Sequence, residues 1–500
     1  MLKKVKALLF HNTSFRQTVA KNTFWLGVSN IGGRLLRAII IIYAARVLGA
    51  EGWGAFSYAI TFVAFLTIFT DSGINAIVTR EAAKGTSREE QDELLGTALR
   101  LKLVLLALGV ILVIFLGPIL TKVESAIPLL PIVSLVLIFD TLREFGFSVI
   151  RARERMEWEA MLFLFTNLAL VGFGFFFLLI RPSALGFTYA YTLGTGLGMA
   201  ATFIFLRRDL PNPFRFFSLK KTFAILNSAW PFALSGVLGG IMVNTDILII
   251  GAFRSAAEVG FYSVALRVIQ LLYLFPAILS VSIFPAISRL AHNADSKVKS
   301  VLEQVVALAF LLAIPLAVGG LITGTQVITL LFGSAYLPGA WSFKILALTL
   351  AVNFPAVILA NTVFAYNRQK LLIIYSAIGV ILNVILDLAL IPVYGIAGSA
   401  WATLISQIVT NIYLWRETKK LVDFSVFSKL KRLIPANIAL AIVAWFLLAV
   451  KLHVLIVIAL SGAIYFGLLF TLKEPLFKEI RLILRAPASS EPAIREAPAE

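Results

Sequence analysis

The sequence has no cysteine and only three histidines among its 500 residues. A chain without cysteine forms no disulfide and no thiolate metal site. The three histidines, His11, His292 and His453, are too far apart in the sequence to form a metal-ligand motif. We therefore predict no metal site and no bound cofactor.

A nucleotide-binding loop is also missing, because no G-x-x-x-x-G-K-[ST] motif occurs in the chain. The longest loops between apolar segments, 79–100 and 207–221, are too short to form a soluble catalytic domain. We therefore expect neither ATP hydrolysis by this chain nor a set of catalytic residues.

Charged residues are scarce, at 14% of the chain, whereas 60% of the residues are hydrophobic and the mean hydropathy is +0.93. Soluble proteins carry about 25% charged residues. Many apolar runs reach about 20 residues, the length of a helix that crosses a bilayer. The sequence therefore predicts an all-α polytopic membrane protein.

Fourteen apolar segments are long enough to be transmembrane helices. They cover residues 22–46, 53–78, 103–121, 126–149, 159–180, 183–206, 224–251, 256–286, 301–323, 339–365, 371–392, 395–415, 433–450 and 453–472. Because the number of segments is even, both termini are expected on the same side of the membrane.

Lysine and arginine are distributed unevenly over the loops. Of the 44 cationic residues, 34 lie in the termini and in the loops on their side, five lie in the opposite loops or at their edge, and five lie further within the segments. Positively charged loops stay in the cytoplasm. We therefore predict a multi-pass protein of the cytoplasmic membrane with both termini cytoplasmic. Contact of these loops with anionic lipid accounts for the net charge of +18 without a nucleic-acid partner.

Three short motifs of the first half recur in the second half in the same order, at offsets of 205 to 207 residues. Asn22-Thr-Phe-Trp25 recurs as Asn227-Ser-Ala-Trp230, Gly32-Gly33 as Gly239-Gly240, and Gly54-Ala-Phe-Ser57-Tyr-Ala59 as Gly260-Phe-Tyr-Ser263-Val-Ala265. A parallel repeat of six transmembrane segments explains the order of the motifs. Chance similarity among apolar helices is the alternative.

The repeat predicts an N-lobe over 22–206 and a C-lobe over 224–418, joined by a cytoplasmic loop over 207–223. Two further segments cover 433–472. Residues 1–21 and 473–500 are expected to be cytoplasmic, and the Pro-, Ala- and Glu-rich tail to be partly disordered. Two lobes around a central cavity form the geometry of a transporter whose site lies between them.

Several motifs together identify a family resemblance. The first half contains Asn22-Thr23, Gly49-Ala-Glu-Gly52, Thr70-Asp71-Ser-Gly73-Ile-Asn, Arg80-Glu81-Ala-Ala and Ile150-Arg-Ala-Arg-Glu-Arg155. The second half contains Trp230-Pro231-Phe-Ala-Leu-Ser235, Asn244-Thr-Asp246-Ile-Leu-Ile and Val259-Gly260-Phe-Tyr262-Ser-Val-Ala265. Over about residues 15–470, this set resembles the polysaccharide-biosynthesis oligosaccharide flippases, which are relatives of lipid II flippases and of multidrug and toxin extrusion transporters.

The resemblance implies a lobed fold that alternates between inward-open and outward-open states. It implies a flippase that moves a polyprenyl-(pyro)phosphate-linked oligosaccharide from the cytoplasmic to the outer leaflet. In relatives the central cavity is cationic and receives the lipid pyrophosphate through arginines of the first and eighth segments. The matching positions here are Arg34, Arg37 and Arg267. Glycosyltransferases or polymerases of the same pathway are the implied protein partners.

Arg34 and Arg37 are three residues apart and share one helix face with Asn30. Arg34 lies about 18 Å into its segment at 1.5 Å per residue, which is too deep for its side chain to reach the membrane surface. One interpretation is a phosphate clamp, because guanidinium groups bind phosphate oxygens bidentately. The other is an ion pair with Asp71. At the repeat offset Val243 corresponds to Arg37 and Thr61 to Arg267, which favours a functional role over a role in building the fold.

Six other charged side chains in the segments are candidates for a gate or for ion coupling: Asp71, Asp140, Arg143, Glu144, Asp246 and Asp387. Asp140, Arg143 and Glu144 lie within four residues on one helix and can neutralise one another, which favours a structural or gate role. Asp246 lies near the outer end of its segment and can reach the interface. Asp387 has Asn383 one turn earlier and is a candidate for a coupling-ion site.

Two other functions compete with the flippase. A multidrug or cation exporter of the same superfamily is expected to have acidic residues in its cavity, whereas the cavity candidates here are mostly basic. A polytopic glycosyltransferase or ligase that uses the same lipid is expected to have acidic residues on a sizeable outer loop, and the outer loops here are short.

Overall fold

The computed structural model describes residues 12, 15–84, 87–212, 216–292, 297–472 and 474. These residues are almost entirely helical, and they contain no strand. The predicted disordered tail and most of the predicted N-terminal segment 1–21 lie outside the described residues.

The helices follow one another along the chain with short connections. They are α2 Phe15–Asp71, α3 Ile74–Ala82, α4 Arg88–Ile111, the π-helix η1 Leu112–Leu116, α5 Gly117–Leu120, the 3-10 helix η2 Glu124–Leu129, α6 Leu130–Ala152, α7 Met156–Ile180, α8 Ala184–Leu206, α9 Leu219–Phe253, α10 Ala256–Leu272, α11 Leu274–His292, α12 Lys297–Phe332, the 3-10 helix η3 Ser334–Gly339, α13 Ala340–Ala365, α14 Gln369–Leu421, α15 Phe427–Leu430, α16 Leu433–Ala449 and α17 Val454–Thr471.

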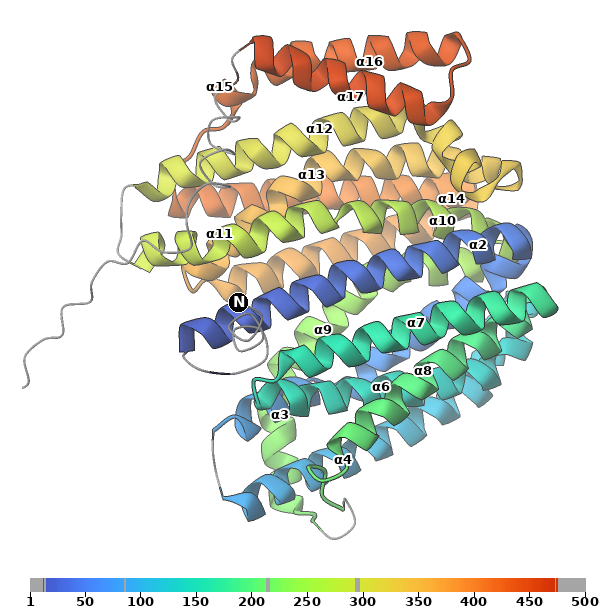
Figure 1. Cartoon of the computed structure of the whole chain (residues 1–500), viewed down its shortest axis with the longest axis vertical. Helices are drawn as coiled ribbons and strands as arrows, with labels where there is room; N and C mark the ends of the chain where they lie inside the picture. The colour runs from blue at the N-terminus through green and yellow to red at the C-terminus, as the bar shows by residue number, and fades with distance from the viewer. Residues whose placement is uncertain are drawn as a thin grey trace, which may run out of the picture.

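The described chain contains twelve helical stretches that are long and apolar enough to cross a membrane. Two of them, in α2 and α14, run through a non-helical glycine, Gly49 (φ 66°, ψ 177°) and Gly395 (φ 61°, ψ −142°). At Gly49 the chain turns back on itself (Figure 1). Counting each half of α2 and α14 as one crossing confirms the fourteen predicted spans. An even number of crossings is consistent with termini on one side, and which side that is stays a prediction.

The largest difference from the predicted spans is at α4, which begins at Arg88 instead of 103. Ser87 caps the helix by accepting a hydrogen bond from the backbone N–H of Glu90 at 3.3 Å, and two glutamates lie in the first turn. Most of the predicted loop 79–100 is therefore helix. The predicted span 256–286 is interrupted at Tyr273, between α10 and α11.

The helices form two neighbouring groups, with α2 at the boundary (Figure 1). Within the first group α2 packs on α6 and α7, and α8 packs on both of these. Within the second group α13 packs between α12 and α14, and α16 and α17 lie on α12. The boundaries of the two predicted lobes stay a prediction.

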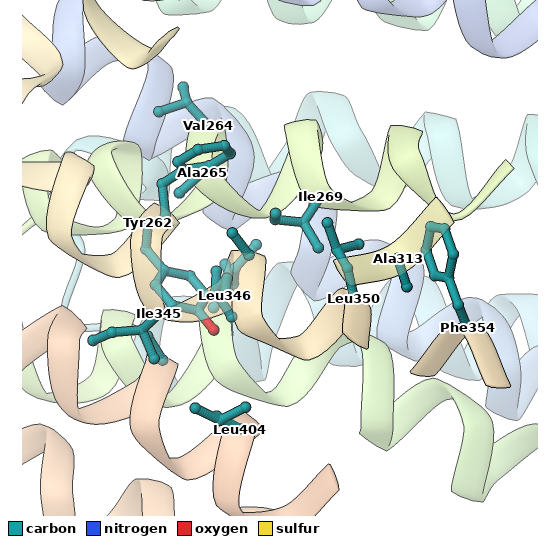
Figure 2. Close-up of a cluster of buried hydrophobic side chains, with 14 of the residues drawn as sticks. Tyr262, Val264, Ala265, Ile269, Ala313, Ile345, Leu346, Leu350, Phe354 and Leu404 are labelled. Carbon is teal, nitrogen blue, oxygen red and sulfur yellow. The ribbon is translucent and has the colours of Figure 1, made fainter. Parts of the chain in front are cut away.

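The core of the second group surrounds Tyr262. Figure 2 shows this side chain extending from α10 past Ile345 and Leu346 of α13, toward Leu404 of α14. Its ring is fully buried. The apolar side chains around it hold the hydroxyl in place beside the charged residues described below.

Candidate functional site

The cationic face of α2 packs in part against α7. Asn30 and Arg34 are exposed, and the Asn30 amide donates to the backbone oxygen of Leu26 at 2.8 Å. Arg37 is half-buried, and its Nε donates to Oδ1 of Asn167 on α7 at 2.8 Å. No ion pair to Arg34 or Arg37 is found in the described part of the chain.

Gly33 lets α7 approach this face. A Cβ at Gly33 would overlap the ring of Phe163, whose centroid lies 6.0 Å from the Arg37 guanidinium carbon. The helix is not broken at Gly32 or Gly33, since the non-helical position in α2 is Gly49. The pair therefore serves close approach and not bending.

Arg267 lies on α10, which packs against α2. Its guanidinium group is close enough to that of Arg37 for their like charges to interact, and Tyr191 of α8 also interacts with Arg267. Arg267 donates to Oε1 of Gln270 at 3.2 Å, and its buried Nε has no partner among the described residues. No ion pair between Arg267 and a carboxylate is found there. The site therefore combines cations from both halves of the chain, and no anion among the described residues pairs with them.

Asp71 does not pair with the α2 arginines. It pairs with Lys102 of α4, whose Nζ donates to Oδ1 of Asp71 at 2.8 Å and to Oδ1 of Asn75 at 2.5 Å. The predicted span 103–121 leaves Lys102 in an inner loop, and the structure corrects this because the lysine is fully buried within α4. The alternative interpretation of Arg34 and Arg37 as partners of Asp71 is therefore wrong for this conformation.

The charged cluster on α6 is internally paired. Arg143 lies 2.9 Å from Asp140 and 3.6 Å from Glu144, and it is buried. Glu144 also lies 3.8 Å from Arg151 at the end of the helix. This arrangement agrees with mutual neutralisation along one helix, while a role in a gate stays a prediction.

A cavity of about 370 Å³ lies beside Asp71 and Lys102. Glu144 and Arg151 line it from α6, and Phe232 lines it from α9. Gly73 (φ 75°) brings α9 close, since a Cβ there would lie 2.6 Å from the backbone oxygen of Ala229. The cavity therefore lies between α9 and the first helix group.

Asp246 and Asp387 come together inside the second group. Asp246 is buried among the helices, so its side chain does not reach out to the interface as the sequence alone allowed. Its Oδ2 accepts hydrogen bonds from the hydroxyl of Tyr262 and, at 2.8 Å, from that of Thr403. Asp387 is fully buried and interacts with Asp246 and with Ser399.

The two carboxylates are not neutralised by any described cation. Oδ1 of Asp246 and both oxygens of Asp387 lack a hydrogen-bond partner among the described residues. The groups around the pair are Tyr262, Thr403 and the amide of Asn383, with no lysine, arginine or histidine among them. Two adjacent buried carboxylates need a bound cation or a shared proton, so this cluster has the donor set of a small-cation site.

Sequence reasoning misses several residues of these sites. Lys102, Asn167 and Tyr191 do not stand out, because one polar residue in an apolar run gives no indication of its partner. Thr403 has a usable signal, since Ser399, Thr403, Gln407 and Asn411 recur every four residues on one helix face.

Comparisons with known proteins identify relatives over most of the chain. The family described as polysaccharide biosynthesis protein matches residues 19–291. A probable low-salt glycan biosynthesis flippase of Haloferax volcanii is 26% identical over 403 residues, which cover 79% of this chain and 82% of that protein. A putative O-antigen transporter of Shigella flexneri is 22% identical, over 80% of this chain and 98% of that protein.

Two solved structures share the fold. The lipid II flippase MurJ in an inward-closed conformation matches with a TM-score of 0.75 and 18% identity, over 91% of this chain and 99% of MurJ. An inward-facing multidrug resistance transporter of the MATE family in the MOP superfamily matches with a TM-score of 0.61 and 16% identity, over 78% of this chain and 95% of that transporter.

Proposed function

Since the chain belongs to the polysaccharide biosynthesis protein family, we propose that it moves a polyprenyl-(pyro)phosphate-linked oligosaccharide from the cytoplasmic to the outer leaflet of the cytoplasmic membrane. It is a multi-pass membrane protein whose relatives are named flippases and O-antigen transporters. In this proposal the chain alternates between inward-open and outward-open states and carries out no covalent chemistry.

The observation that carries the proposal is the placement of Arg37 and Arg267. They lie on α2 and α10, near enough for their like charges to interact, and no described carboxylate forms an ion pair with either. Unpaired cations inside a membrane protein are costly and mark ligand sites. A pyrophosphate supplies the missing negative charge, and guanidinium groups bind its oxygens bidentately.

The surrounding residues support an anionic ligand. Arg34 is exposed one turn from Arg37 and adds a third positive charge. Asn167 holds the Arg37 guanidinium by accepting from Nε, which leaves the terminal nitrogens for a ligand. An organic cation would be repelled by three arginines, so the exporter alternative is disfavoured.

We further propose that Asp246 and Asp387 bind the coupling cation. Their unpartnered buried oxygens, with the hydroxyls of Tyr262 and Thr403, can coordinate Na⁺ or hold a proton. A transport cycle needs a ligand that binds one conformational state more tightly than the other. A cation that neutralises the carboxylate pair only when bound meets this need.

Reconstituted protein tests the flippase proposal. The probe is a fluorescent polyprenyl pyrophosphate that carries one hexosamine, and the readout is its loss of accessibility to an impermeant quencher. We expect Arg37→Ala and Arg267→Ala each to slow flipping about 10- to 100-fold, since charge-assisted hydrogen bonds contribute about 1.5–3 kcal/mol.

Arg80→Ala is the matched control, because Arg80 is exposed and pairs with neighbouring Glu81 outside the site. Thermal stabilisation by polyprenyl pyrophosphate without sugar provides a readout that is independent of the glycan. If an organic cation stabilises the protein and the pyrophosphate lipid does not, the proposal is wrong and the exporter is right.

A further inference from the structure

A second set of polar side chains lies inside the second helix group, away from the arginines. Asn353 of α13 donates to the hydroxyl of Tyr273 at 2.8 Å and to Oε1 of Gln407 at 2.7 Å. Asn411 donates to Oδ1 of Asn353 at 3.3 Å, and Tyr375 donates to Oδ1 of Asn411 at 3.4 Å. These five side chains, called the polar chain below, form one continuous hydrogen-bonded network.

The polar chain starts next to the carboxylate pair. Thr403, which donates to Asp246, lies one helical turn before Gln407, and Asn411 lies one turn further along the same face. The first half of α14, before the turn at Gly395, carries a second face of the same spacing, with Asp387, Asn383, Gly379 and Tyr375 four residues apart. A Cβ at Gly379 would lie 3.3 Å from the methyl carbon of Thr410, so the two halves of α14 run close together there.

The network leads from the carboxylates toward the predicted cytoplasmic side. Tyr375 lies twelve residues from Asp387 in the direction of the start of α14, which corresponds to about 18 Å along the helix axis. Tyr375 lies six positions after Gln369, where α14 begins on that side. The polar chain therefore spans most of the distance between the carboxylates and that end of the bundle.

The composition of the polar chain suits the passage of an ion better than its tight binding. Its members are three amides and two tyrosine hydroxyls, and none carries a charge that would retain an ion. Asn353, Gln407 and Tyr375 are only half-buried. Weak, repeated oxygen ligands let an ion enter and leave a pore. A purely structural hydrogen-bond network contributes most to stability when its side chains are fully buried and all their polar atoms are hydrogen-bonded.

We infer that the polar chain is the cytoplasmic access path of a small monovalent cation, Na⁺ or a hydrated proton, that binds at Asp246 and Asp387. The inference rests on the ion coupling proposed above, and it assigns the direction in which the ion leaves. Outward access would then use a different route, so that the site opens to one side at a time.

The absence of cysteine makes the test direct, because every introduced thiol is unique. Asn353→Cys, Gln407→Cys and Asn411→Cys are treated in oriented membrane vesicles with impermeant thiol reagents of equal size and opposite charge. We expect labelling from the cytoplasmic side only, with the cationic reagent reacting at least tenfold faster than the anionic one. In an Asp246→Asn/Asp387→Asn background the preference is expected to fall below twofold, because the attracting charges are gone.

Two single-cysteine variants calibrate the reaction. Thr362→Cys is the negative control, since Thr362 lies on α13 nearer the same end than Asn353, is fully buried and donates to its own helix. Asp423→Cys is the positive control, because its side chain is 83% exposed. Labelling needs no glycan lipid and no transport. A protein that fails to flip lipid can therefore still confirm or reject the path.

The ion is identified by protection of Gln407→Cys. Slower labelling on addition of Na⁺ at constant pH indicates Na⁺. Lower pH slows the labelling of every thiol because the thiolate reacts, so a proton is indicated only if lowering the pH without Na⁺ slows Gln407→Cys more than it slows Asp423→Cys. The inference is overturned if neither ion is indicated, if the path cysteines react no faster than Thr362→Cys, or if both reagents react at the same rate.

Discussion

Gly54 of α2 and Gly260 of α10 lie opposite one another where the two helices cross. The two glycines occupy equivalent positions in the predicted repeat. A Cβ on Gly54 would overlap the backbone oxygen of Ala256, and a Cβ on Gly260 would overlap the backbone oxygen of Ala50. Next to this crossing the indole of Trp53 donates to Ser263 at 2.9 Å. Closely approaching backbones at small residues are the usual basis of helix association in membranes.

Gly54→Ala is expected to destabilise the protein by about 1–3 kcal/mol, because an added methyl in a closely packed contact forces the helices apart. The measurement is thermal unfolding in detergent. Gly172→Ala, on α7 with no atom within 4 Å of the point where its Cβ would lie, is expected to leave the unfolding temperature unchanged or slightly higher. Equal effects of the two substitutions would contradict the crossing as a point of close packing.

Gly49→Ala tests the turn in the middle of α2. The position has open space around it, so no steric clash with a neighbour is introduced. Its backbone conformation is one that glycine adopts almost alone, and an alanine there is expected to cost about 1–3 kcal/mol. Loss of stability in Gly49→Ala but not in Gly27→Ala, a helical position that is equally open, would attribute the effect to backbone strain.

Asp71 and Lys102 are expected to respond unequally to substitution. Asp71→Ala leaves a fully buried ammonium whose remaining partner is Asn75, and we expect a loss of about 3–5 kcal/mol. Lys102→Met leaves a carboxylate that is one-third exposed to solvent, so the loss is expected to be smaller. Unfolding midpoints of the two variants measure the difference.

The exposed pair of Lys84 and Glu81 provides the comparison for that experiment. Lys84 is 57% exposed, and surface pairs contribute about 0–1 kcal/mol. Lys84→Ala is therefore expected to leave the unfolding midpoint nearly unchanged. A larger effect for Lys102→Met than for Asp71→Ala would show that the lysine is not the buried member of the pair in the membrane.

Tyr262→Phe tests the carboxylate site without changing its shape. The substitution removes the hydroxyl that donates to Asp246, leaving Thr403 as the remaining donor to that oxygen. We expect the ion concentration for half-maximal transport to shift by threefold or more, while the maximal rate stays within twofold. Tyr465→Phe is the control, since it removes an equally buried hydroxyl whose partner is the backbone oxygen of Leu311.

The transmembrane helices can be predicted because the length of an apolar run fixes where a helix crosses a bilayer. The start of α4 cannot be predicted in this way. Its first turns are polar, and the signal for its start is the local cap at Ser87 followed by Glu89 and Glu90. Hydropathy is insensitive to a cap, so it places the start of the helix fifteen residues too late and leaves Lys102 in a loop.

The partners within the candidate sites depend on how distant helices pack. Arg34, Arg37 and Arg267 are conspicuous in the sequence because each is a charge in an apolar segment, and the structure brings Arg37 and Arg267 together. Asp71 and Lys102 are 31 residues apart and Asp246 and Asp387 are 141 apart. No local pattern connects residues at such separations, so the sequence leaves the partner of Asp71 open and does not indicate Lys102.

The contact between α2 and α10 is reciprocal: Gly54 meets Ala256, and Gly260 meets Ala50. A surface that pairs with its own counterpart in this way is the kind that two identical polypeptides use to form a twofold dimer. A half-length chain that presents this surface is therefore expected to assemble with a copy of itself, and joining two such copies end to end would produce the predicted repeat.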